Sequence, residues 1–352
     1  MNILPGIAND CAHDLTKPGT YEWWYVDAIS HDGEWALTFI WFIGIPMSPY
    51  YNETFERFIK SGENPPFAKD FPGYSLSLYH RGKRVYNAFH EFPPDAFKTS
   101  FDEPFIGIGK TKLFFKNGKF GLEIDTVFKN DARGFKGNFT LIPNNFLKEN
   151  LFKKSEITEN HTWIPAAPDC EISGAFSLFE YGEEKLQSVF KGRAYHDHNI
   201  GLRPLSDDFG DWYWGRVHCK NFTLIYYYAF SPQNIPNLEW LGVFKNGELN
   251  EIDKPQFELK VFKRNLMGLR SAWEISANGV FKNEEFIFKS RAENVLEYGP
   301  FYLRFLAHFE VNIGGEVSKN KGITEFINCG KLRSKLIRPF IKVPIVKKKI
   351  ID

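Results

Sequence analysis

Short apolar runs separated by turn signals recur along most of the chain, and they predict β-strands. Residues 35–42 form a continuous apolar run, which is typical of a buried strand. Residues 74–79 alternate between large and small side chains, as in a strand with one face in the core. Comparable runs, with a repeat of about 8–12 residues, lie at 112–115, 120–124, 222–230, 241–244, 257–262, 273–276 and 286–290.

The turn signals between these runs favour hairpins. Asn117-Gly118, Asn246-Gly247 and Asn278-Gly279 each predict a two-residue turn, because Asn-Gly accepts the positive φ angles of a type I′ turn. Arg81-Gly82 offers a similar turn. Helical periodicity is scarce, and residues 51–62 form the best helix candidate. The pattern predicts an all-β protein built from antiparallel sandwiches or barrels.

The length of 352 residues suits either two ordinary domains or one large β domain. The proline-rich stretch 164–168 and the polar stretch 181–187 are candidate breaks. We place the division near residue 190, which gives two β-barrel-like halves at 1–190 and 191–352. A barrel with an open mouth can hold an apolar ligand.

Composition adds one strong feature, the aromatic content. The chain has 36 Phe, 15 Tyr and 9 Trp, which suits either an aromatic core or a pocket for a large apolar ligand. The net charge of +1 does not favour nucleic acid as a partner. The four cysteines are scattered, which indicates free thiols in a reducing compartment. The N-terminal residues lack a signal-peptide pattern, and no apolar stretch is long enough to span a bilayer, so we expect a cytoplasmic protein.

The C-terminal stretch 331–349 differs from the rest of the chain. It carries eight Lys and Arg residues and no acid, interleaved with apolar residues. This mixture suits peripheral contact with an anionic membrane, on its inner, cytoplasmic face. It equally suits a solvated tail whose apolar residues pack on the last barrel. Pro339 and Pro344 prevent one long helix.

The candidate chemistry lies in residues 192–201. On a strand, Tyr195, Asp197 and Asn199 share one face. His161 and Trp163 share a face by the same alternation. Inward polar groups cost free energy unless they are hydrogen-bonded or functional. These segments therefore predict either a site with an acid, a base, an indole and a phenol, or a buried polar network that holds strands in register.

The remaining ionisable residues of these segments have structural explanations. His196 and His198 can share a metal, but the sequence identifies no third ligand. The alternative is two imidazoles that point outward from a barrel wall. We therefore expect no metal. Glu22 and Asp27 fit a structural role better than a catalytic one, and Arg216 is expected to pair with a carboxylate inside the second barrel.

Five segments, in order, resemble the carotenoid 1,2-hydratase family, also called hydroxyneurosporene synthase. The matching motifs are the Trp-Trp-Tyr-Val-Asp-Ala run at 23–28, Ser-Pro-Tyr-Tyr at 48–51, His-x-Trp-x-Pro-x-x-Pro at 161–168, Gly-x-x-Tyr-x-Asp-x-Asn-x-Gly-x-x-Pro-Leu at 192–205, and Trp-x-Trp-x-Arg at 212–216. Two departures are the histidines at 196 and 198 and an apparent insertion at 181–187.

The resemblance implies a fold of two lipocalin-like antiparallel β-barrel domains packed together, with few short helices. It also implies hydration of the terminal C1–C2 double bond of an acyclic or monocyclic carotenoid, without a cofactor. The family's proposed functional residues fall on His161, Trp163, Tyr195 and Asp197. By position in the matched motifs, we expect the substrate to contact Trp23, Trp24, Tyr25, Asn199, Trp212 and Trp214.

Hydration of an unactivated alkene explains why such residues are needed. The acid must be protonated at neutral pH, and burial can raise the pKa of a carboxyl group by about 3–5 units. Asp197 is the expected proton donor, Trp163 and Tyr195 stabilise the cation, and His161 orients the water. The alternatives are a lipocalin-like protein that only binds an isoprenoid or lipid, a pericyclic cyclase of the same superfamily, and a hydratase for a shorter isoprenoid.

Overall fold

The chain folds into two compact units in a computed structural model that describes residues 1–129, 131–146 and 159–348. The first unit comprises residues 1–204 together with the segment that begins at Lys342, and the second comprises residues 205–341. The division therefore lies at Pro204/Leu205, whereas residue 190 falls within strand β12 (Glu183–Gly201). The end of the tail belongs to the first unit.

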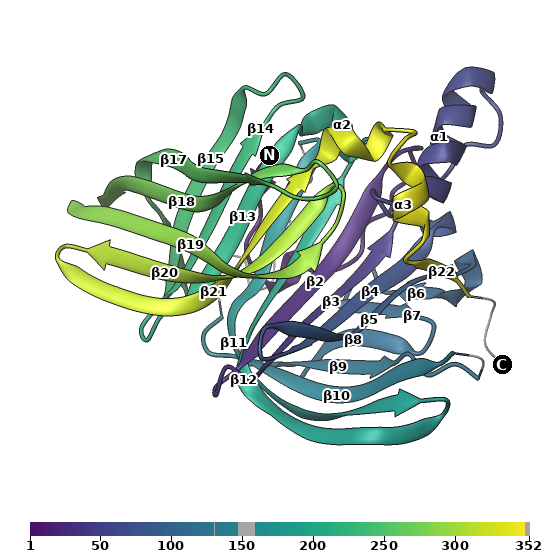
Figure 1. The fold of residues 1–352 in the computed structure, drawn as a ribbon, viewed down its shortest axis with the longest axis horizontal. Coiled ribbons are helices and arrows are strands. Elements are labelled where there is room, and N and C mark those ends of the chain that lie inside the picture. Colours follow the sequence, from purple (N-terminus) through teal and green to yellow (C-terminus); the bar gives the residue numbers. More distant parts are fainter. Residues whose placement is uncertain (130, 147–158, 349–352) are drawn as a thin grey trace. The chain divides into compact units, whose positions relative to one another are not determined.

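The first unit contains one sheet, to which 13 strands belong among the described residues (Figure 1). Neighbouring strands are antiparallel, except that β1 pairs with β11 and β22 pairs with β5 in parallel. In spatial order the strands are β22 (Ile345–Lys347), β5 (Lys83–Glu91), β4 (Pro72–His80), β3 (Trp35–Ile43), β2 (Tyr21–Ser30), β12, β11 (His161–Glu180), β10 (Arg133–Pro143), β9 (Lys119–Asp125), β8 (Thr111–Lys116), β7 (Phe105–Ile108) and β6 (Phe97–Thr99), with β1 (Asn2–Ile3) beside β11.

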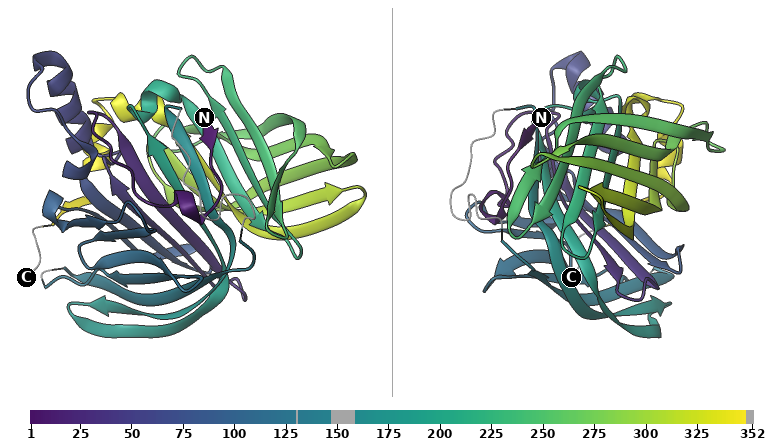
Figure 2. Two further views of the ribbon diagram at one scale, coloured as in Figure 1. Left: turned by 180° about the vertical axis from the view of Figure 1, so that it is seen from behind. Right: turned by 90° about the vertical axis from the view of Figure 1, so that its left-hand side faces the viewer.

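The second unit contains a nine-stranded antiparallel sheet, counted over the part of the chain that the structure describes. Both sheets are strongly curled rather than flat (Figure 2). In spatial order the strands of the second sheet are β16 (Glu248–Glu251), β15 (Pro236–Lys245), β14 (Thr223–Phe230), β13 (Asp211–His218), β21 (Glu316–Asn328), β20 (Tyr302–Ile313), β19 (Glu284–Tyr298), β18 (Arg270–Phe281) and β17 (Asp253–Arg264).

Helices are few and short, as the sequence predicts. Helix α1 (Pro49–Ser61) begins where the Ser48 side chain accepts hydrogen bonds from two backbone N–H groups, and it ends at Gly62 with φ of 73°. The others are α2 (Leu205–Asp208), α3 (Arg338–Lys342) and the 3-10 turns Ile7–Asn9, Ala68–Asp70, Pro94–Ala96 and Cys329–Arg333. Among the described helices, none has the length and apolarity needed to cross a bilayer.

Three of the four predicted turns are confirmed, and one is wrong. Asn117-Gly118, Asn246-Gly247 and Arg81-Gly82 have positive φ at both residues and connect adjacent strands. Asn278-Gly279 instead lies inside β18, and the turn is at 282–283, where φ is 49° and 70°. Gly279 has a packing role, because a Cβ there would lie 2.5 Å from the Ile252 side chain. The glycine of this Asn-Gly pair is therefore explained by the close approach of the Ile252 side chain, and not by a turn.

Strand β2 and the second half of β12 are buried on both faces, and this property positions the candidate site. Trp24 and Val26 of β2, with Ala194 of β12, belong to the core of the first unit. The residues that alternate with these on each strand, such as Tyr25 and Tyr195, point to the opposite face and are buried as well. We call this opposite face of β2, β12 and β11 the site face; its members are Tyr21, Trp23, Tyr25, Asp27, His161, Trp163, Tyr195, Asp197 and Asn199.

The basic C-terminal segment is attached to the first unit. Strand β22 extends the sheet beyond β5, and the Lys348 ammonium contacts both carboxylate oxygens of Asp131 at 2.6 Å. Lys342 pairs with Glu53 at 2.9 Å, and the Lys347 ammonium lies 3.6 Å from the ring centroid of Tyr50. Lys349 lies outside the described residues. Several basic side chains of this segment are therefore engaged by the protein itself.

Candidate active site

Asp197 is the centre of the site face. Its side chain is almost fully buried, with 4% of the residue exposed. The indole N–H of Trp163 donates to Oδ2 at 2.8 Å, and the Tyr195 hydroxyl donates to the same oxygen at 2.7 Å. The Asn199 amide donates to Oδ1 at 3.0 Å. The structure thus brings four of the residues expected at the site into direct contact.

Strand β11 becomes irregular just after Trp163. The pairing of β11 with β12 is irregular between Ile164 and Ala167 and again between Ala167 and Cys170. Pro165 and Pro168 lie in these two interruptions. Proline cannot donate to a β-ladder and is therefore found at bulges, which bend a strand and redirect its side chains. The two prolines of the motif thus have a structural explanation beside the site.

His161 lies on the same face of the sheet as the Asp197 group. The Tyr21 hydroxyl is 2.9 Å from Nδ1 of His161. Burial lowers the pKa of His161 to about 3, although a side-chain hydrogen bond with Asn199 acts in the opposite direction. The imidazole is therefore neutral at physiological pH, as a group that accepts a proton must be before it acts.

Aromatic rings and a second carboxyl group surround this centre. The ring centroids of Tyr21 and Trp23 are 5.2 Å apart in a stacked arrangement. The Tyr25 hydroxyl donates to Asp27 at 2.9 Å, and Asp27 pairs with Tyr195 across the strands. Burial, followed by the neighbouring Asp197 carboxyl, raises the pKa of Tyr195 well above its usual value. The Tyr195 phenol therefore keeps its proton and remains a donor.

His196 and His198 lie on the opposite face of β12 and are fully buried, rather than pointing outward. His196 contacts Asp10 at 2.8 Å and the Tyr25 carbonyl at 2.9 Å. His198 contacts Glu22 at 2.8 Å and Asp10 at 3.4 Å. Each ring nitrogen therefore faces an oxygen that can accept a hydrogen bond. Two imidazolium groups between two carboxylates fit this arrangement.

The electrostatics of this cluster agree with ion pairing. Burial alone would lower the pKa of His198, but its bonds to Asp10 and Glu22 raise it to about 9. Burial would likewise raise the pKa of both carboxyl groups, but their histidine partners lower it. Breaking one such buried pair is costly because a charge remains uncompensated in the core.

The same cluster is where a metal ion could be held, among the described residues. The ligand atoms of His13, Glu22 and His198 lie within 4.8 Å of one another. Both imidazoles, however, contact one Glu22 oxygen at 2.8 and 2.9 Å. These are hydrogen-bond lengths between a ring N–H and a carboxylate. A metal would require both rings to lose that proton and Glu22 to move.

The expected substrate contacts divide into three groups. Trp23, Tyr25 and Asn199 lie on the site face. Trp24 does not, because it belongs to the core and stacks on His198 with 4.3 Å between ring centroids. Trp212 and Trp214 are buried on β13 of the second unit, and their role as substrate contacts stays a prediction.

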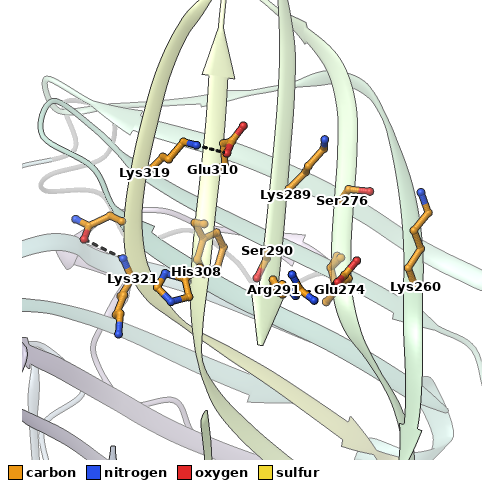
Figure 3. A pocket seen from close by; sticks show the side chains of 13 residues that line it. Lys260, Glu274, Ser276, Lys289, Ser290, Arg291, His308, Glu310, Lys319 and Lys321 are labelled. Atoms are coloured by element: carbon orange, nitrogen blue, oxygen red, sulfur yellow. Dashed lines mark hydrogen bonds and ion pairs between the residues drawn. The ribbon is translucent and has the colours of Figure 1, made fainter. Parts of the chain in front are cut away.

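A hollow of about 570 Å³ on the second unit does not suit a carotenoid (Figure 3). Charged side chains of β17–β21 line it, and they pair across neighbouring strands. Arg291 contacts Glu274 at 3.1 Å, and Lys319 contacts Glu310 at 2.7 Å. A polyene offers no polar groups to satisfy such a wall. The hollow is a charged sheet surface rather than an apolar pocket.

Comparison with solved structures defines the class of protein. A putative AttH of Nitrosomonas europaea superimposes with a TM-score of 0.60 at 12% identity, over 91% of this chain and 95% of that chain. At this identity the likeness concerns the fold, which is lipocalin-like. The predicted fold class is confirmed.

The sequence comparisons then identify the family. The model of the carotenoid hydratase CrtC family matches residues 39–351, so the chain belongs to this family. A hydroxyneurosporene dehydrogenase of Chlorobaculum tepidum is 29% identical over 97% of this chain and 91% of that protein. An acyclic carotenoid 1,2-hydratase of Thiocapsa roseopersicina is 26% identical over 86% of this chain and 67% of that protein.

Sequence reasoning missed some of the residues that form the site and the opposite cluster. Tyr21 lies just before the first matched motif, and Asp10 and His13 carry no sequence signal at all. The structural role expected of Glu22 agrees with its place in the ion-pair cluster. The alternation of β2 could have separated Trp24 from Trp23 and Tyr25, because odd and even positions point to opposite faces.

Proposed function

We propose that this protein adds water across the terminal C1–C2 double bond of an acyclic or monocyclic carotenoid, to form a tertiary 1-hydroxy carotenoid. Membership of the carotenoid hydratase family and the name of the Thiocapsa relative support the reaction class. The observation that carries the proposal is the buried Asp197 carboxyl, held by an indole, a phenol and an amide on an aromatic face. No cofactor takes part in the proposed steps.

The first step is proton transfer from Asp197 to C2. Trp163 and Tyr195 both donate to Oδ2, so the acid form carries its proton on Oδ1, beside Asn199. The electron pair of the double bond takes this proton, and a tertiary cation remains at C1. Burial disfavours the charged form of a carboxyl group, which keeps the acid protonated before the step. The two hydrogen bonds to Oδ2 then stabilise the carboxylate that the transfer leaves.

The second step is capture of the cation by water. The rings of Trp163 and Tyr195 offer π faces to the cation, and a desolvated cation–π contact is worth about 2 kcal/mol. Water adds to C1, and neutral His161 accepts the proton that the new C–O bond releases. The protonated alcohol is a far stronger acid than an imidazolium, so a His161 pKa of about 3 still allows this transfer. The imidazolium then gives up this proton and the Asp197 carboxylate takes one up, so both groups return to their starting forms and the net change is the addition of one water.

The test compares Asp197→Asn with the native protein and with Asp125→Asn, a half-buried carboxylate of the same sheet. Each protein is supplied with lycopene or a monocyclic carotene, and products are separated by chromatography and mass spectrometry. We expect the native protein and Asp125→Asn to form a product one water heavier. Asp197→Asn should form none while its circular dichroism is unchanged. A hydrated product from Asp197→Asn contradicts the acid assignment.

The same assay separates the competing functions. A dehydrogenase, the activity that the name of the Chlorobaculum relative describes, yields a product two hydrogens lighter. A cyclase yields an isomer of unchanged mass. A lipocalin-like binding protein retains the carotenoid unchanged, and its Asp197→Asn variant does so equally well.

We also propose that the C-terminal segment contacts an anionic membrane, at its cytoplasmic face, where a carotenoid substrate resides. Leu336, Phe340 and Val343 are 84%, 62% and 82% exposed. Lys335 lies next to the first of them in sequence. Exposed apolar side chains beside basic ones favour the surface of an anionic bilayer.

Vesicle flotation tests the membrane contact. We expect the protein to float with vesicles that contain phosphatidylglycerol and to stay behind with pure phosphatidylcholine. A variant with Leu336→Ser, Phe340→Ser and Val343→Ser should lose the binding, because its apolar contact is removed and its charge is kept. Equal flotation of the variant and the native protein would refute the contact.

A further inference from the structure

Tyr21 occupies a special place at the edge of the site. It is the first residue of β2 and is 1% exposed. In the sheet it pairs with Gly201 of β12, and Gly201 in turn pairs with His161 of β11. The three residues therefore form one row across three strands. The Tyr21 side chain spans this row, and its hydroxyl is 2.9 Å from Nδ1 of His161.

Gly201 is what allows Tyr21 to reach His161. A Cβ at position 201 would collide with the ring of Tyr21, which lies flat across the backbone of β12. Any other residue would push the ring away from the sheet. This gives a physical reason for a glycine in the motif at 192–205 that the chemistry of Asp197 alone does not explain. Stacking on Trp23, with 14° between the ring planes, holds the Tyr21 ring in place from the side.

The contact decides which nitrogen of His161 is left for the reaction. Nδ1 faces the Tyr21 hydroxyl, so Nε2 is the nitrogen that can accept the proton of the water. The Asn199 amide contacts Oδ1 of Asp197 at 3.0 Å on the same face of the sheet. A tyrosine hydroxyl can donate or accept, so it suits either protonation state of the imidazole that it contacts.

We propose that Tyr21 is a positioning residue that sets the ring orientation and proton position of His161, and that Gly201 is the residue that admits it. When His161 is neutral, Nδ1–H donates to the Tyr21 oxygen and Nε2 keeps the lone pair that accepts the proton of the water. When His161 has taken this proton, Nδ1–H keeps the same acceptor. The hydroxyl satisfies both arrangements. The catalytic part of this role rests on the proposed hydration.

The experiment uses the full chain labelled with ¹⁵N-histidine. The His161 signals are assigned by their loss in His161→Gln, and the two ring nitrogens report which one carries the proton. Tyr21→Phe removes the hydroxyl and keeps the ring. Gly201→Ala keeps the hydroxyl and displaces the ring, so it provides a second, independent variant. Tyr74→Phe is the matched control, because the Tyr74 hydroxyl contacts Nδ1 of His90 at the same distance of 2.9 Å elsewhere in this unit.

We expect the native His161 to show one tautomer, and both Tyr21→Phe and Gly201→Ala to shift its ¹⁵N signals towards a mixture. Tyr74→Phe should leave these signals unchanged.

For the reaction, kcat should fall about tenfold or more in both site variants, with KM little changed, because general acid–base assistance is lost. His161 signals that do not move in either variant overturn the positioning role. Signals that move without a change in kcat overturn its part in the reaction. A native protein without hydratase activity refutes the proposed function instead, and the nitrogen spectra still decide the role of Tyr21.

Discussion

The buried ion pairs around His198 predict that stability falls as pH rises through the alkaline range. The ordinary pKa of a histidine, 6.5, is raised to about 9 at His198 by Asp10 and Glu22, against the opposing effect of burial. A raised pKa means that the folded state binds its proton more tightly than the unfolded state does. The stabilisation is therefore fully present below about pH 6.5 and is lost as pH rises towards about 9.

The magnitude follows from the same values. Each pKa unit corresponds to about 1.4 kcal/mol, so the difference between 6.5 and about 9 is worth about 3 kcal/mol of unfolding free energy. The perturbation is His198→Gln, which cannot carry the charge. We expect this variant to lose about 3–5 kcal/mol near pH 6, because the buried carboxylates of Asp10 and Glu22 each lose one of their two imidazole partners. It should also show a weaker decline between pH 6 and pH 9 than the native protein.

The assay is urea unfolding followed by tryptophan fluorescence, at about pH 6, 7.5 and 9. The matched control is His31→Gln. His31 pairs with Glu171 at the surface, with the two side chains 58% and 47% exposed, and such pairs contribute little. We expect this control to follow the native pH dependence. If His198→Gln and the native protein lose the same free energy between pH 6 and pH 9, the reasoning is refuted, because the buried imidazolium would then not be the source of the effect.

Further predictions concern the acid, the buried cluster, the metal alternative and the misplaced turn. Trp163→Phe keeps the ring and removes one bond to Asp197, and we expect kcat to fall by about tenfold, or about 1.4 kcal/mol, in the carotenoid assay. Glu22→Gln should lower the unfolding free energy by about 3–5 kcal/mol in urea titrations, because a buried negative charge that faces the two imidazoles of His13 and His198 is removed. Dialysis against EDTA should leave the turnover rate unchanged, and a loss that Zn²⁺ restores would favour the metal alternative. Gly279→Ala should cost about 1–3 kcal/mol on thermal unfolding, because its Cβ meets the Ile252 side chain; an unchanged midpoint would contradict that packing.

Part of the site could be predicted from the sequence because strand alternation is a local property. Successive side chains point to opposite faces, so Tyr195, Asp197 and Asn199 had to share a face once the segment formed a strand. The same rule put His196 and His198 on the other side. It could not show that this other side is also buried, because burial depends on the neighbours that cover it. The outward placement considered for these two histidines is therefore replaced by a core of ion pairs with Asp10 and Glu22.

Local sequence patterns were enough to predict the all-β class, three of four turns and the candidate catalytic residues, since apolar spacing and Asn-Gly signals act over a few residues. The strand registers instead depend on the whole fold. Tyr21 contacts His161, which is 140 residues away in sequence. The contact exists because the registers of β2, β12 and β11 place Gly201 between these two residues in the sheet. The whole fold also decided the unit boundary and the return of the tail to the first unit. Pairing between distant strands is selected by the packing of the whole sheet, so no short window of sequence contains it.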